Sequence, residues 1–287
     1  MASSTRASGI ARRLPRLART PAVAAGALLV AGFLVLGAAG PWLAGRDPLE
    51  QDLAEFLQPP SAGRWLGTDE LGRDLLSRVV VAARADLILV VAGIALATAL
   101  ALPLGLIAGY GQGALDRAIT ALSDAVLTFP SLVLAVVLVS LFGAGLRGVV
   151  AAVALTTAPA LFRLIRSLVL QTAAQDYVDA ARALGAGHPA ILGRHVVPNI
   201  LGRGIVYTTL LGSHALLTIT ALGFLGLGVQ PPAPEWGNML ANARTYLGTA
   251  PWLTLFPAAA IVLFVLGLNL LGEALRDLLD PKLLWRP

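Results

Sequence analysis

The 287-residue chain contains few residues that could catalyse a reaction. It has no cysteine, which excludes a disulfide, a thiolate metal site and a thiol nucleophile. Its three histidines, His188, His195 and His214, form no H-x-x-x-H pair, which argues against a metal site. The only lysine is Lys282, so there is no G-x-x-x-x-G-K-S/T phosphate loop. We therefore expect no catalytic residue, no metal site and no cofactor in this chain, and we predict that it is not an enzyme.

A second group of polar residues lies inside long apolar runs, where a polar group is costly in hydrocarbon. Such residues tend to face the interior of a helical bundle or a pathway through it. Asp124, Ser213 and His214 are the candidate residues of a translocation path, and pairing between helices is the alternative for Asp124 and His214. Asn269 and Glu273 are expected to pair structurally or to lie near the inner water boundary.

Residues 171–199 form the longest segment that neither fits inside a bilayer nor reads as a simple linker. Spacing of i, i+4 and i+7 places three side chains on one helical face: Tyr177, Ala181 and Leu184. Gly185 and Gly187 interrupt this helix, and Pro189 suits the first turn of a second one. Pro198 closes the unit. The pattern predicts a helix-turn-helix between two membrane spans, a shape suited to docking in another protein.

The composition is that of an integral membrane protein. Hydrophobic residues make up 57% of the chain and charged residues only 13%. The formal net charge of +5 comes almost entirely from arginines. Because these arginines are spread among apolar runs and follow membrane topology, they do not indicate nucleic-acid binding.

Six apolar runs reach or exceed the ~20 residues needed to cross a bilayer. They cover residues 22–44, 87–109, 118–142, 148–170, 201–228 and 251–275. Pro130 predicts a kink in the third run. A signal peptide is the alternative for the first run, but 23 residues exceed the about 7 to 15 of a signal core. Of the 21 basic residues, 14 fall in the segments that we assign to the cytoplasmic side, which predicts cytoplasmic termini.

These runs divide the chain into five parts. They are a cytoplasmic basic amino tail (1–21), a first transmembrane helix (22–44), an external segment (45–86), a five-helix core that includes the cytoplasmic loop 171–199 (87–275), and a cytoplasmic tail (276–287). Within the external segment, residues 68–78 predict an amphipathic helix capped by Thr68 that lies flat on the membrane or on neighbouring helices. A solvated connector with one helical turn is the alternative.

Residues 179–198 resemble the cytoplasmic signature of ABC importer permeases, E-A-A-x-x-x-G followed by nine residues and I-x-L-P. The match consists of Asp179-Ala180-Ala181, then Gly185, then His195-Val196-Val197-Pro198. The spacing agrees at every step, with Asp in place of Glu and with His and Val in place of Ile and Leu. The form RHVVPN is similar to that of the dipeptide, oligopeptide and nickel branch. Residues 64–78 and 224–240 resemble segments of the second permease of that branch.

The resemblance implies an all-α integral membrane protein with the type I ABC importer permease fold. That fold has six transmembrane helices, an external interfacial helix and a cytoplasmic coupling helix, here residues 184–192. Contact with an ATPase subunit is implied for Asp179, Ala180, Ala181, Leu184, Gly185, His188, Pro189, Ile191, Leu192 and Pro198. Contact with an external partner is implied for Trp65, Asp69, Arg73, Asp74, Glu235 and Trp236.

The implied function is that of a permease subunit in the bacterial cytoplasmic membrane that imports short peptides. Its partners would be a second homologous permease, two cytoplasmic ATPase subunits that bind ATP and Mg, and an external substrate-binding protein. Nickel complexes, glutathione and haem are alternative cargoes. A proton-coupled carrier that uses Asp124, His214 and Glu273 as relays is the alternative mechanism, and a non-transporting membrane scaffold is the third interpretation. The absence of an inverted repeat and the presence of a docking segment argue against the carrier.

Overall fold

The computed structural model describes residues 21–279, so the amino tail and the end of the carboxyl tail lie outside the described residues. The regular structure of the described residues is helical, with one isolated bridge between Thr68 and Asp74 and irregular connections such as 44–74. The helices are α2 (Pro21–Leu43), α3 (Leu75–Gly111), α4 (Ala114–Leu127), α5 (Ser131–Phe142), α6 (Leu146–Ala173), α7 (Asp176–Ala183), α8 (His188–Ile191), α9 (Val197–Phe224), α10 (Trp236–Ala243) and α11 (Trp252–Leu279). Short 3-10 turns lie at Leu53–Glu55 and Arg244–Tyr246, and a π-helical turn lies at Leu192–Val196.

Within the described residues, five helices are long and apolar enough to cross a membrane, and a sixth span arises if α4 and α5 are counted together. These two helices are bent by 99°. The bend confirms the kink predicted at Pro130, which has an extended ψ of 124° and precedes α5. Proline also disfavours helical geometry in the residue before it, so the helix ends ahead of Phe129.

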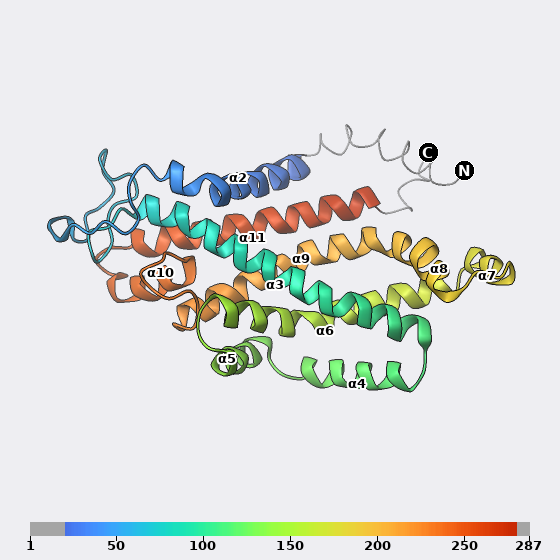
Figure 1. The fold of residues 1–287 in the computed structure, drawn as a ribbon. Coiled ribbons are helices and arrows are strands. Elements are labelled where there is room, and N and C mark those ends of the chain that lie inside the picture. Colours follow the sequence, from blue (N-terminus) through green and yellow to red (C-terminus); the bar gives the residue numbers. More distant parts are fainter. Residues whose placement is uncertain (1–20, 280–287) are drawn as a thin grey trace.

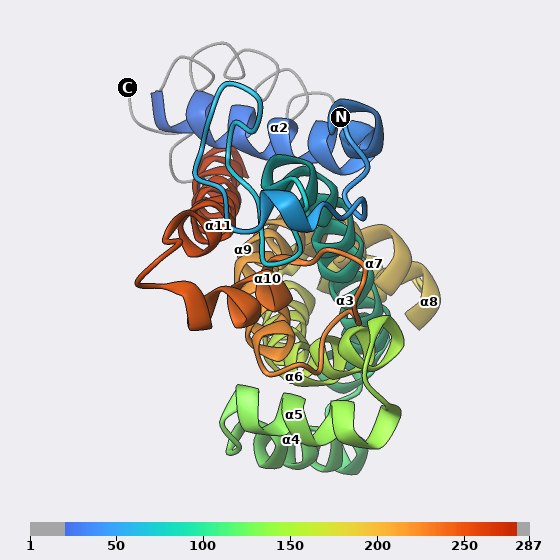
Figure 2. The same cartoon turned by 90° about the vertical axis from the view of Figure 1, so that its left-hand side faces the viewer.

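The long helices form a bundle whose two ends carry different short elements (Figure 1). The segment 44–74 and α10 lie together at one end, whereas α7 and α8 lie at the opposite end (Figure 1). Seen along the bundle, α2 lies at one edge and the bent pair α4 and α5 at the other, with α6 between them (Figure 2). The bundle therefore presents α4 and α5 on a side that α2 does not cover.

Glycines bring α3 and α6 into close contact. A Cβ atom added at Gly93 would lie 2.6 Å from Val153 Cγ1, and one added at Gly105 would lie 2.6 Å from Ile165 Cγ2. At Gly109 the added atom would lie 2.8 Å from the Arg166 carbonyl oxygen. Small residues at such contacts allow membrane helices to pack backbone against side chain. The two helices are thus held together along most of their length.

The predicted helix over residues 68–78 is wrong in its first part. Residues 68–74 form a turn, and α3 begins only at Leu75, where Asp74 is the N-cap and accepts a hydrogen bond from Ser77 N at 2.8 Å. Gly72 has φ +69°, and a Cβ atom there would meet the Asp52 carbonyl oxygen at 1.7 Å. This packing stabilises the turn over a helix. Since α3 runs without interruption to Gly111, the boundary that we placed at residue 86 lies inside this helix.

Candidate functional site

The segment 176–191 folds as two short helices joined by a tight turn, which we call the α7–α8 hairpin. Leu184 caps α7, and Gly185 follows with φ +84°, a conformation that favours glycine. The N–H of Gly185 donates to the Arg182 carbonyl, and that of Ala186 to the Ala181 carbonyl, each at 3.0 Å. These two bonds form a Schellman motif, which ends the first helix. The predicted helix-turn-helix is therefore present, with its turn at Gly185.

Most of the residues that the resemblance assigns to coupling are on the surface of this hairpin. Those exposed are Asp179, Ala180, Leu184, Gly185, His188, Pro189 and Pro198, and those half-buried are Ala181 and Leu192. Leu184 is 89% exposed, which is unusual for a leucine at the tip of a turn. Ile191 is fully buried, so its side chain supports the hairpin from within the bundle.

Two buried side chains of the hairpin and one in the turn that follows it attach the hairpin to the bundle. Val178, Ile191 and Val196 are each fully buried in a core cluster that also contains Leu161 and Val169 of α6. In addition, Tyr110 Oη at the end of α3 and His188 Nδ1 share a hydrogen bond at 2.9 Å. Sequence analysis did not single out Val178 or Tyr110, although Val178 lies three residues before Ala181, the spacing of one helical face. The hairpin is a supported element and not a free loop.

A cavity of about 470 Å³ opens among α4, α5, α6 and α9. Its lining combines apolar groups with four hydroxyl groups and one imidazole, from Leu127, Ser131, Leu132, Thr156, Thr157, Ala160, Leu211, His214, Leu217, Thr218 and Ala221. Its volume lies in the range of small-ligand sites, which is roughly 300–1,000 Å³. Among the described residues that line this cavity there is no carboxylate and no arginine.

The three predicted path residues occupy different environments. His214 lines the cavity. Ser213 is only 4% exposed and donates to Asn269 Oδ1 at 3.0 Å, which joins α9 to α11 and gives Asn269 the structural pairing expected of it. Asp124 forms an ion pair with Arg163, with Nη2 and Oδ1 2.5 Å apart. Only His214 is thus placed by the structure on the cavity wall.

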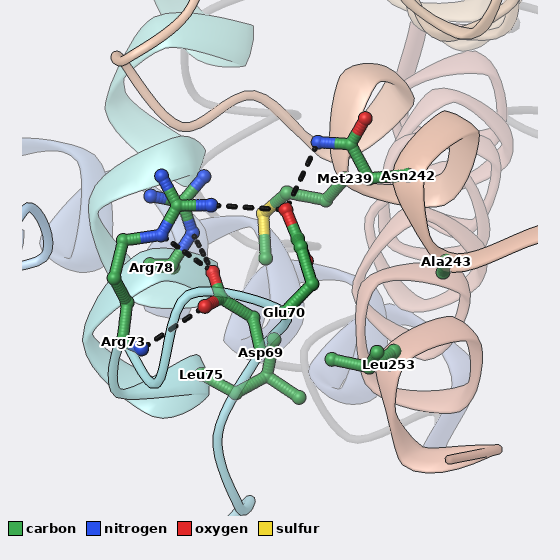
Figure 3. Close-up of a pocket in the computed structure, with 9 residues that line it drawn as sticks. All are labelled: Asp69, Glu70, Arg73, Leu75, Arg78, Met239, Asn242, Ala243 and Leu253. Atoms are coloured by element: carbon green, nitrogen blue, oxygen red, sulfur yellow. Dashed lines mark hydrogen bonds and ion pairs between the residues drawn. The ribbon is translucent and has the colours of Figure 1, made fainter. Parts of the chain in front are cut away.

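At the opposite end of the bundle, an ionic cluster joins the turn 68–74 to α3 and α10 (Figure 3). Asp69 Oδ2 lies 2.7 Å from Arg73 Nε and 3.2 Å from Arg78 Nε. Glu70 Oε1 accepts from Arg73 Nη2 at 3.1 Å and from Asn242 Nδ2 of α10 at 3.5 Å (Figure 3). The cluster fixes the position of the turn 68–74 against α3 and α10.

The residues predicted to contact an external partner are mostly engaged inside the chain. Five of them are buried: Asp69, Arg73, Asp74, Glu235 and Trp236. Trp65 is 71% exposed, so it is the member of the set whose side chain is accessible. Contact of these six residues with an external partner stays a prediction.

Glu235 and Trp236 hold α10 against the start of α3. Glu235 is the N-cap of α10 and accepts from Gly237 N at 2.6 Å and Asn238 N at 2.9 Å. The indole Nε1 of Trp236 donates to the Val79 carbonyl at 3.0 Å. Burial raises the pKa of Glu235 to about 6, against the lowering effect of its backbone hydrogen bonds. Asp86, which interacts with Glu235, has no local sequence signal because its partners are about 150 residues away.

The bundle and its supported hairpin define a multi-pass membrane protein. The family model of the "binding-protein-dependent transport system inner membrane component" matches residues 101–285. The chain belongs to this family of inner membrane transport permeases, and it is not an enzyme. Among the residues that the structure describes, no three His, Cys, Asp or Glu side chains gather as a possible metal site.

Relatives of the chain are named as permease proteins of peptide or glutathione transport systems. It is 46% identical over 249 residues to the di/tripeptide transport system permease protein DppC of Pseudomonas aeruginosa, covering 85% of this chain and 82% of that protein. It is 40% identical over 258 residues to the dipeptide transport system permease protein DppC of Alkalihalophilus pseudofirmus, covering 90% and 85%. It is 40% identical over 232 residues to the glutathione transport system permease protein GsiD of Pectobacterium atrosepticum, covering 81% and 77%.

Proposed function

We propose that this chain is one of two permease subunits of an ATP-driven importer of short peptides. The α7–α8 hairpin is the observation that carries the proposal, because it exposes Leu184 and Gly185 while Val178 and Ile191 anchor it in the bundle. Two relatives are named for dipeptide or di/tripeptide transport, which supports a short peptide as the cargo. Glutathione, itself a tripeptide, is the second candidate, favoured by the relative named for its transport.

The hairpin end of the bundle would face the cytoplasm, as would both termini. This orientation rests on the excess of arginine in the segments at that end. Two ATPase subunits would bind ATP and Mg there, and one of them would hold the hairpin in a surface groove. An external binding protein would deliver the peptide to the opposite end, and the second permease would complete the path beside α4 and α5.

The chain offers a direct mechanical connection from the hairpin to the cavity. α8 continues through the π-helical turn Leu192–Val196 into α9 without leaving helical geometry. Leu211 and His214 of α9 line the cavity. Movement of the hairpin on an ATPase subunit would therefore displace one wall of the cavity, which is the coupling that an ATP-driven permease needs.

Reconstituted transport tests the proposal. The chain is co-expressed with the second permease and ATPases that accompany it, placed in proteoliposomes and supplied with the binding protein and labelled dialanine. ATP-dependent uptake is the expected result. Uptake that persists without the ATPases and follows a proton gradient would favour the carrier that uses Asp124, His214 and Glu273 and would overturn the proposal.

A further inference from the structure

Arg163 of α6 and Asp124 of α4 form a half-exposed ion pair on the side of the bundle that α2 leaves uncovered. Arg163 donates from Nε at 3.0 Å and from Nη2 at 2.5 Å, both to Oδ1 of Asp124. The two side chains are 52% and 50% exposed. A half-exposed charge pair on spanning helices is costly against lipid, so this surface faces protein or water.

The guanidinium group of Arg163 is only partly used by this pair. Arginine has five N–H donors, and two of them are engaged here. Within the described residues no second acceptor for Arg163 is found, and Oδ2 of Asp124 receives no hydrogen bond. The pair thus leaves N–H donors of Arg163 free for another acceptor.

The neighbouring pair, Arg166 with Asp116, has a different character. Arg166 Nε donates to Oδ1 at 2.5 Å and Nη2 donates to Oδ2 at 2.7 Å, which is the two-pronged geometry of a saturated pair. Its side chains are 29% and 10% exposed. Arg166 therefore serves to join α4 to α6. Of the two arginines of α6 that pair with α4, Arg163 is the one with N–H donors available to a ligand.

Arg163 lies beyond the lining of the 470 Å³ cavity, toward the hairpin end of α6. On α6 it follows the lining residues Ala160 by three positions and Thr156 by seven, which places all three on one helical face. On α4, Asp124 precedes the lining residue Leu127 by three positions. The pair is consequently about one helical turn beyond the cavity wall, on the hairpin side.

The cavity itself suits the middle of a short peptide better than its charged ends. Thr156 and Thr218 donate their hydroxyl hydrogens to carbonyls of their own helices, so their oxygens remain as acceptors for peptide N–H groups. The remaining wall is largely apolar and could contact small side chains. A peptide's terminal carboxylate, however, finds no cation among the described lining residues.

We propose that Arg163 binds the terminal carboxylate of the transported peptide as the peptide leaves the cavity. Asp124 positions the guanidinium group of Arg163 and remains its ion-pair partner when no cargo is present. This inference rests on the proposed function and adds a residue that selects cargo with a free carboxylate. The carboxylate would take two donors in place of, or beside, Asp124, a geometry that arginine favours and lysine does not reproduce.

The test compares two cargoes in the reconstituted transporter, dialanine and its C-terminal amide. The binding protein is the same for every variant, so its own preference cancels when each variant is divided by wild type for the same cargo. For Arg163→Gln we expect acid uptake to fall at least tenfold more than amide uptake. For Asp124→Asn, which breaks the same ion pair but keeps the guanidinium, we expect the preference for the acid to remain.

The paired variants separate recognition from structure. If the ion pair only joins α4 to α6 or contacts the second permease, both variants lower acid and amide uptake by equal factors, and that result would overturn the inference. Arg163→Lys keeps the charge and supports assembly if the glutamine variant does not insert; we expect it to lower acid uptake less than glutamine does, and equal loss of acid and amide would again refute the idea. Absence of ATP-dependent uptake by wild type would instead refute the proposed function.

Discussion

The backbone N–H of Trp236 donates to Oδ2 of Asp86 at 3.2 Å, which ties the start of α10 to the early turns of α3 across 150 positions of sequence. The Trp236 ring is fully buried and contacts Phe33 of α2 and Phe264 of α11, with ring centroids 5.7 and 6.3 Å apart. One residue in the connection before the last span thus contacts three spanning helices. The end of the bundle opposite the α7–α8 hairpin, which is the outer end in the proposed orientation, is organised around it.

Replacing Trp236 should therefore weaken the outer end. We expect Trp236→Ala to cost about 3–5 kcal/mol, as is usual for a large buried aromatic side chain. Trp236→Phe retains most of the packing and loses the indole hydrogen bond to Val79, for about 1 kcal/mol. Heat-unfolding midpoints of the purified complex measure both. Equal midpoints for wild type and the alanine variant would show that the ring does not stabilise this end.

Glu235 should make the outer end less stable as the pH rises. Its pKa is raised from 4.5 to about 6 by burial, so the folded chain binds its proton more tightly than the unfolded chain does. The stability from this group is fully present below about pH 4.5 and is lost as the pH rises through about 6. The loss is about 2 kcal/mol at pH 7.

Glu235→Gln supplies the control for this pH dependence. The amide oxygen can still accept at the start of α10, but it does not titrate. We expect the difference in unfolding midpoint between wild type and this variant to change between pH 4.5 and 7. The midpoint of wild type should fall relative to that of the variant as the pH rises. A difference that stays constant over this range would contradict the role assigned to Glu235.

The turn of the α7–α8 hairpin should couple ATP hydrolysis to transport. Asparagine adopts positive φ more readily than other residues, so Gly185→Asn preserves the turn at modest cost. Gly185→Asp has nearly the same shape and adds a charge in the groove that we propose the ATPase provides. We expect the aspartate variant to insert normally and to lose uptake and substrate-stimulated ATP hydrolysis, while the asparagine variant keeps most of both. Full activity of the aspartate variant would remove the coupling assignment.

Substitutions at Arg73 and Trp65 should distinguish a loss of stability from a loss of contact with the external partner. Arg73→Met removes the ion pairs from Arg73 to Asp69 and Glu70, while Arg78 remains 3.2 Å from Asp69. We expect a cost of about 1.5–3 kcal/mol, seen as a lower unfolding midpoint. Trp65→Ala removes an exposed ring and should leave the midpoint within about 0.5 kcal/mol of wild type. Binding of the external protein to the complex is then measured for each. Unchanged affinity in the Trp65 variant would refute its predicted contact.

Sequence reasoning succeeded where the signal is local. Gly185 and Pro189 interrupt and restart a helix within a few residues, and Pro130 bends the third apolar run, so these features were predictable from neighbouring residues alone. The start of α3 was not, because Thr68 and Asp74 are both good N-caps. The contact of Gly72 with Asp52 decides between them, and it belongs to the folded chain.

Sequence reasoning also could not tell which face of a spanning helix points toward the cavity. Apolar residues occupy every face of α9, so periodicity does not tell which of its side chains line the cavity. Ser213 and His214 are adjacent in sequence, yet the first bonds to Asn269, 56 residues on, and the second lines the cavity. Arg163 was not singled out from the sequence for a similar reason, because its partner Asp124 lies 39 residues earlier on another helix.

The glycine contacts between α3 and α6 also bear on how the molecule can move. A pair of helices that leaves no room for even a methyl group at Gly93, Gly105 and Gly109 cannot slide or rotate against each other without separating. By contrast, α4 and α5 meet at a 99° bend with three non-helical residues between them. The bundle thus contains a rigid pair of helices, α3 and α6, and a hinged pair, α4 and α5. The Asp124–Arg163 ion pair connects the hinged pair to the rigid one.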